Sequence, residues 1–92
     1  MDKFHLKLSP AAIREIDLLS DKRVQVIFEK LEALKKNPFP QGKRIKKIKG
    51  KQSTFYRLRF DKYRIFYSIQ EQEVIILKVV LKKDADTFIK RL

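Results

Sequence analysis

The first third of the chain alternates between apolar and polar positions and then changes to helical spacing. Phe4, Leu6 and Leu8 occupy every second position, which predicts a half-buried strand over residues 3–8. Ser9-Pro10 combines a helix N-cap with a proline at the first helical position, and Ser20-Asp21 begins a second helix by the same capping logic. Apolar residues follow each cap at steps of three and four, so we expect two helices that form an antiparallel hairpin.

The second half of the chain has the pattern of an antiparallel sheet. Residues 54–60 and 63–69 alternate, and only Asp61-Lys62 separates them, which predicts a two-residue β-hairpin. In that register Tyr56, Leu58 and Phe60 lie opposite Tyr67, Ile65 and Tyr63, with all six in the core. Residues 74–81 form a third β-rich run, and residues 84–92 are expected to form a short helix.

These elements predict one α+β domain over residues 1–92. It has an N-terminal strand, a helical hairpin, an antiparallel sheet of three to four strands and a short C-terminal helix. The sequence leaves open which alternate residues of the last strand face the core. If Ile75, Leu77, Val79 and Leu81 join the core, the connection after Ile69 must hold an odd number of residues or the strand must contain a bulge.

The hairpin register places three arginines on the face that the core does not use. These are Arg57, Arg59 and Arg64, and the last two are expected directly opposite one another. Like charges in that position are destabilising unless both reach water or hold an anion. Phe55 and Phe66 share this face, where they either stack on bases or pack beneath the terminal helix.

The charge of the chain is concentrated in its middle. The 92 residues carry a net charge of +12, and residues 38–60 contain eight Lys or Arg and no acid. Such a block suits a polyanion such as nucleic acid, and the alternative is a solvated basic surface. The segment from Lys43 to Lys51 is too basic to form a core element and is expected to be an electrostatic contact strip. The RNA-binding candidates are the basic residues of this segment together with one lysine of the last strand: Lys43, Arg44, Lys46, Lys47, Lys49, Lys51 and Lys78.

The chain lacks the residues that several kinds of covalent, metal or phosphate-binding site require. The chain has no Cys and a single His, His5, so disulfides are excluded and a zinc site is not expected. The two glycines do not form a phosphate loop, and no carboxylate cluster is evident, so we expect no metal or other cofactor. The N-terminus is interrupted by charges and no apolar run could span a bilayer, which predicts a cytoplasmic protein without a membrane partner.

RNA supplies its own nucleophile in the 2′-OH group. An RNA-cleaving site can therefore consist of cations that stabilise the charge of the phosphorane, together with groups that move protons. A lysine crowded by other cations can serve as the base, because such crowding lowers its pKa. His5, on the polar side of the first strand, is expected to have no catalytic role.

Three stretches of the chain resemble one family. The run from Asn37 to Pro40, the Ile48-Lys49-Gly50 segment and above all the hairpin of residues 56–67 are similar to the RelE-type toxins of the RelE/ParE superfamily. The resemblance extends over nearly the whole chain. It implies a type II toxin that enters the ribosome, cuts mRNA without a metal ion to leave a 2′,3′-cyclic phosphate, and is silenced by a cognate antitoxin.

The resemblance also implies roles for individual residues. Arg57 and Arg59 would contact or activate the reacting nucleotide, Arg64 would stabilise the phosphorane, and Lys83 together with Lys82 would hold the leaving side. The family's later Tyr is absent here, and Phe88 in this segment could stack on a base but cannot move a proton. Two alternatives therefore stay open: a gyrase inhibitor of the ParE branch, and a toxin that has lost activity and only binds its antitoxin.

Overall fold

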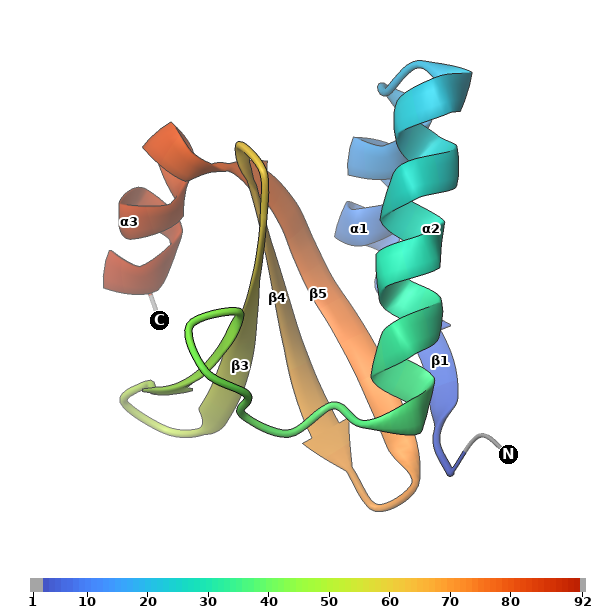
Figure 1. The fold of residues 1–92 in the computed structure, drawn as a ribbon. Helices are drawn as coiled ribbons and strands as arrows, with labels where there is room; N and C mark the ends of the chain where they lie inside the picture. Colours follow the sequence, from blue (N-terminus) through green and yellow to red (C-terminus); the bar gives the residue numbers. More distant parts are fainter. Residues whose placement is uncertain (1–2, 92) are drawn as a thin grey trace.

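The computed structural model describes residues 3–91, which fold into one sheet with helices on both faces (Figure 1). In chain order the elements are β1 (His5–Leu8), α1 (Pro10–Asp17), α2 (Asp21–Lys36), β2 (Ile45–Lys49), β3 (Thr54–Phe60), β4 (Tyr63–Gln70), β5 (Glu73–Leu81) and α3 (Lys82–Lys90). The strands lie in the order β1-β5-β4-β3-β2, and β1 runs parallel to β5 while the other pairs are antiparallel. Helices α1 and α2 cover one face, and α3 crosses the other. The α+β class is confirmed, with a parallel edge strand that the sequence did not indicate.

Both predicted helix caps are present. The Ser9 hydroxyl accepts a hydrogen bond from the Ala12 backbone N–H at 3.1 Å, and the Ser20 hydroxyl accepts one from Arg23 at 3.4 Å. These bonds satisfy backbone donors that the first turn of a helix leaves without partners. No helix within residues 3–91 has both the length and the apolar character that crossing a membrane requires.

The main core lies between the sheet and the first two helices. The β3–β4 register is the predicted one, with Tyr56 opposite Tyr67, Leu58 opposite Ile65 and Phe60 opposite Tyr63. The turn is tight because Asp61 adopts a φ of 52°, in the left-handed region that Asp tolerates better than most residues. All six of these residues belong to or pack against the core beneath α1 and α2.

The last strand has a bulge, which changes which of its residues face the main core. The register shifts between Phe66 and Tyr67, which leaves Leu77 as an extra residue on β5. Val74 and Ile76 therefore face the main core, whereas Ile75 and Leu77 do not. Of the four residues whose placement was left open, Val79 belongs to this core and Leu81 packs against it, and the bulge that this placement requires is present.

Helix α1 closes the edge of β5 where β1 has ended. Beyond Ile76 the outer edge of β5 has no strand partner on this side. The Ser9 hydroxyl donates to the Leu77 carbonyl at 2.8 Å, and a Glu15 carboxylate oxygen accepts from the Val79 N–H, also at 2.8 Å. Two side chains of α1 thus replace the missing ladder bonds of an exposed strand edge.

The second face of the sheet has a small core of its own beneath α3. Phe55 is 2% exposed, Phe66 is completely buried, and both rings pack against Phe88. Ala85 is buried in the same cluster. Of the two readings of Phe55 and Phe66, packing beneath the terminal helix is therefore correct. The helix begins at Lys82, two residues earlier than expected, and Leu92, its expected last residue, lies outside the described residues.

The basic segment after the second helix contributes an edge strand. Ile45 pairs with Leu58 and is 2% exposed, so this part of the segment is a core element, contrary to expectation. Gly50 then lets the chain turn back, because a Cβ there would lie 2.9 Å from the Ser53 carbonyl oxygen and 3.1 Å from the Phe55 ring.

Candidate anion-binding site

A strongly cationic cavity lies between the sheet and α3. Its volume is about 300 Å³, and three arginines enter it from the two strands of the hairpin. The residues that line it are Arg57 and Arg59 of β3, Arg64 of β4, and Lys82, Ala85, Asp86 and Ile89 of α3. Four of the five predicted catalytic residues therefore share one cavity, although they are spread over 26 positions of the sequence.

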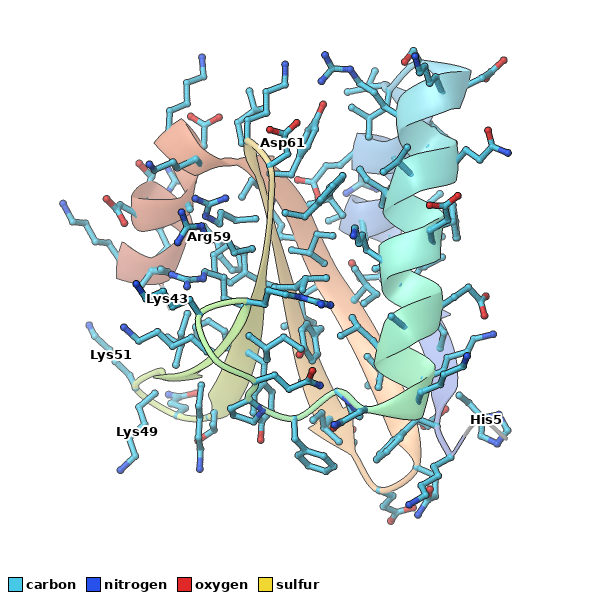
Figure 2. All side chains as sticks on the ribbon, viewed as in Figure 1. His5, Lys43, Lys49, Lys51, Arg59 and Asp61 are labelled. Atoms are coloured by element: carbon cyan, nitrogen blue, oxygen red, sulfur yellow. The ribbon has the colours of Figure 1, made fainter. Side chains whose placement is uncertain are left out.

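Strand alternation places the arginines together. Arg57 and Arg59 are two positions apart on β3, so both side chains leave the sheet on the same face. Arg59 and Arg64 form a directly opposed cross-strand pair, as the two-residue turn predicts. Figure 2 shows Arg59 on the side of the sheet where α3 lies. The fold thus holds like charges close together, which costs free energy unless an anion neutralises them.

Arg64 is the buried member of the group, with 6% of its surface exposed. One guanidinium nitrogen, Nη1, donates to the carbonyl oxygens of Asp61 at 3.0 Å and of Tyr63 at 2.7 Å, which ties the side chain to the hairpin turn. Burial, and then the charges of Arg59 and Arg57, lower the pKa of the Arg64 guanidinium. The hairpin pattern predicts an open face here, and the burial of Arg64 corrects that prediction; it follows from the position of α3 on this side of the sheet.

Arg57 carries a buried donor without a partner. Its Nε atom is inaccessible to water and makes no hydrogen bond within residues 3–91. A buried donor without an acceptor costs about 1–3 kcal/mol. Arg57 lines the cavity, and a guanidinium matches the paired oxygens of a phosphate.

Helix α3 adds one further cation and one acid. Lys82 and Asp86 are four residues apart, so one face of the helix presents both to the arginines. Lys83 does not line this cavity but a neighbouring one of about 560 Å³, which shares Lys82 and Asp86 with it and also includes Lys62. By sequence spacing, Asp61 and Asp84 are the acids expected nearest this face, and Asp86 was not predicted there. A helix counted from Lys82 places residues 82, 85, 86 and 89 on one stripe, and that spacing could have revealed it.

The register divides the basic strip between the two faces of the sheet. Lys46 pairs with Arg57 and so lies on the arginine face, whereas Lys47 pairs with Tyr56 and Lys49 with Thr54, on the face of the helical hairpin. The Arg44 carbonyl accepts a bond from the Arg59 N–H at 2.7 Å. Figure 2 shows Lys43 on the α3 side beside Arg59, and Lys49 and Lys51 toward the far end of the sheet.

Two of the RNA-binding candidates have partners within the protein. The Lys78 ammonium lies 2.8 Å from a Glu15 carboxylate oxygen and also sits 5.9 Å from the centre of the Phe88 ring. The Phe88 ring lies 4.7 Å from that of Phe66 and anchors α3 to the sheet. His5 lies on β1, at the opposite edge of the sheet from β2, far from the arginines (Figure 2).

Comparison with known proteins identifies the family of this fold. Residues 6–86 match the model of the family described as ParE toxin of type II toxin-antitoxin system, parDE. A protein of Methanocaldococcus jannaschii, named "Putative toxin RelE1", is 27% identical over 84 residues, which cover 89% of this chain and 92% of that protein.

Solved structures share the same fold at lower identity. The chain is similar to the archaeal RelE–RelB complex of Pyrococcus horikoshii, with a TM-score of 0.74, 23% identity and coverage of 87% of this chain and 96% of that one. It also resembles the toxin–antitoxin complex RelBE2 of Mycobacterium tuberculosis, with a TM-score of 0.73, 20% identity and coverage of 86% and 98%. Because the family model matches most of the chain, this protein belongs to the ParE toxin family of type II toxin–antitoxin systems, within the RelE/ParE superfamily.

Proposed function

We propose that this toxin is an endoribonuclease that cuts mRNA at the ribosome, using the 2′-OH of the RNA as the nucleophile and no metal ion. The observation that carries the proposal is the cavity under α3, where Arg57, Arg59, Arg64 and Lys82 converge. Four cations against one acid favour a phosphate over a neutral ligand. The buried Nε of Arg57 supplies a donor that still needs an acceptor.

Each cation has a distinct task in this reaction. Attack of the 2′-oxygen on the adjacent phosphorus places extra negative charge on the non-bridging oxygens, and donors that are already in position stabilise that charge. Arg64 is the most rigid of them, because its bonds to two carbonyl groups fix its side chain. In this proposal Arg57 and Arg59 hold the phosphate from β3, and Lys82, which lines the same cavity, protonates the departing 5′-oxygen.

The partners that we propose follow from the same surface and from the relatives. Lys46 extends the cationic face from the cavity to the sheet edge, where a single-stranded RNA could continue. Related toxins of Pyrococcus horikoshii and Staphylococcus aureus were solved in complexes with antitoxins, RelB and YefM. We therefore propose a cognate antitoxin as the protein partner of this chain.

The first test replaces Arg59 by Gln. Arg59 is exposed, so the substitution removes a cation of the cavity without opening the core. In a cell-free translation reaction, primer extension on the reporter mRNA should show translation-dependent cuts with the unmodified toxin. We expect the Arg59→Gln variant to cut about 10²–10³-fold more slowly, the cost of removing one donor from a site of this kind.

The matched control for this test is Lys47→Gln. It removes the same charge from an exposed strand position, but on the opposite face of the sheet. Cleavage by this variant should stay within a few-fold of the unmodified toxin. Equal cleavage by the unmodified toxin and Arg59→Gln would show that the cavity is not the reactive site.

A second candidate function is inhibition of DNA gyrase, favoured by one observation: the matching family model carries the ParE description. The test uses the same purified protein in a supercoiling assay. Intact mRNA together with blocked supercoiling would replace the endonuclease proposal, and intact mRNA with normal supercoiling would leave a toxin that only binds its antitoxin.

A further inference from the structure

The cationic cavity contains a single group that can accept a proton. Arginine and protonated lysine have only donors, so Arg57, Arg59, Arg64 and Lys82 can hold a phosphate but cannot take a proton from a hydroxyl group. Asp86 is the one carboxylate among the described residues that line this cavity. Asp86 is an exposed residue, which leaves it accessible to a ligand.

The hydroxyl groups of Tyr67 and Tyr63 are not placed to do this work. The Tyr67 hydroxyl is buried and donates to the Pro38 carbonyl at 2.7 Å, on the face of the helical hairpin. The Tyr63 hydroxyl accepts from Arg23 at 2.6 Å and belongs to the same core. Neither residue lines the arginine cavity.

Asp86 also has no ion-pair partner within residues 3–91. Glu15, in contrast, is paired with Lys78 at 2.8 Å. A carboxylate that served only to neutralise the cluster would be expected to close onto one of the four cations, as Glu15 closes onto Lys78. The open geometry of Asp86 instead leaves room for a group between it and the arginines.

We infer that Asp86 is the general base of the reaction proposed above; the inference rests on that proposed function. A carboxylate oxygen of Asp86 takes the proton of the 2′-OH while the bond from O2′ to phosphorus forms. The bond from phosphorus to O5′ breaks, and the Lys82 ammonium gives its proton to O5′. The products are a 2′,3′-cyclic phosphate and a free 5′-OH, and proton exchange with water restores both side chains.

Asp86 lies one helical turn after Lys82 on α3 and lines two adjacent cavities. The groups that face Asp86 are the three arginines, Lys82 on its own helix, and Lys62 and Lys83 across the neighbouring cavity that Asp86 also lines. All of them are cations, so Asp86 is the one acidic side chain among the described residues that line either cavity.

The test compares Asp86→Asn with Asp84→Asn. Both substitutions remove one negative charge from α3 and keep the side-chain size, but Asp84 does not line the cavity. Primer extension gives the single-turnover cleavage rate, and an RNA with 2′-O-methyl groups, which cannot react, gives the affinity. We expect Asp86→Asn to lower the cleavage rate about 10²–10⁴-fold, the range of general base catalysis, with equal or tighter binding. Asp84→Asn should cleave at nearly the normal rate.

The other outcomes separate the two proposals. If the unmodified toxin does not cut RNA, the proposed function itself fails. If the unmodified toxin cuts and Asp86→Asn cuts as fast or faster, Asp86 is only a counter-ion and the inference is overturned. Asp86→Glu, which keeps the carboxylate, should recover part of the rate. Equal loss in the Asn and Glu variants would indicate a structural role instead.

Discussion

Arg64 is a charged residue in a position where charge is costly. It is 6% exposed, and its pKa is lowered by burial and by two neighbouring arginines. The bonds from its Nη1 to two hairpin carbonyls offset part of the cost and fix the side chain. We expect Arg64→Lys to fold but cleave poorly, since a lysine keeps the charge but loses the fork geometry. Replacement by Ala would also remove the hairpin bonds and would confuse loss of activity with loss of stability.

Tyr67 is a second residue whose burial has a measurable consequence. Burial, and then the nearby Tyr56, raise its pKa above the ordinary value of 10.0. Its hydroxyl donates to the Pro38 carbonyl, which secures the loop between α2 and β2. Tyr67→Phe should therefore lower the free energy of unfolding by about 1–2 kcal/mol at neutral pH, because it leaves a buried carbonyl without its donor.

The same tyrosine predicts a pH dependence of stability. Because its pKa is raised in the folded state, its contribution is complete below pH 10.0 and is lost as pH rises, when the unfolded chain ionises first. Above pH 10 the unmodified protein should lose about 1.4 kcal/mol more per pH unit than Tyr67→Phe. Urea unfolding of both proteins between pH 8 and about 11 measures the difference. Parallel curves would contradict this account of Tyr67.

At the scale of elements, the β3–β4 hairpin could be predicted completely and its neighbours could not. A two-residue turn determines the register by itself, so the pairing of Arg59 with Arg64 followed from the sequence. The register of β5 depends on a bulge at Leu77 that no local pattern indicates. Asp86 was missed because the expected helix started at Asp84, and two residues change which side chains face the sheet.

The edge strand β2 shows why composition alone was misleading. Its lysines suggested a fully solvated segment, yet two isoleucines three positions apart are enough to fix it to both hydrophobic clusters. Once the segment is a strand, neighbouring lysines point to opposite faces. Lys46 therefore belongs to the arginine face and Lys47 does not, a difference that the composition of the segment cannot show.

The placement of Lys46 and Lys47 on opposite faces predicts how the salt dependence of RNA binding differs between their variants. Lys46→Gln should weaken binding of a 2′-O-methylated single-stranded RNA and reduce the slope of log K against log salt by about 0.7, the value for one lost phosphate contact. Lys47→Gln should leave the slope unchanged. Fluorescence anisotropy titrations at several salt concentrations measure both. Equal slopes for the two variants would mean that RNA does not cross the sheet edge at Lys46.

At the scale of the whole molecule, the two faces of the sheet have different roles. The face beneath α1 and α2 contains the main core, which stabilises the domain. The other face has only a small cluster around Phe55 and Phe66, and the space that remains under α3 contains the arginines. A net charge of +12 favours polyanions in general, and the one buried side-chain donor without a partner among residues 3–91, Arg57 Nε, lies on this face.

The most direct test of this account is the chemistry of the cut ends of the mRNA. After a translation reaction with the purified toxin, we predict a 2′,3′-cyclic phosphate on the upstream fragment and a 5′-OH on the downstream fragment, because the 2′-oxygen is the nucleophile. Both ends should form about 10²–10³-fold more slowly with Arg59→Gln and at nearly the normal rate with Lys47→Gln. A 3′-OH with a 5′-phosphate would mean that water attacks the phosphorus, and it would contradict the role proposed for the cationic cavity.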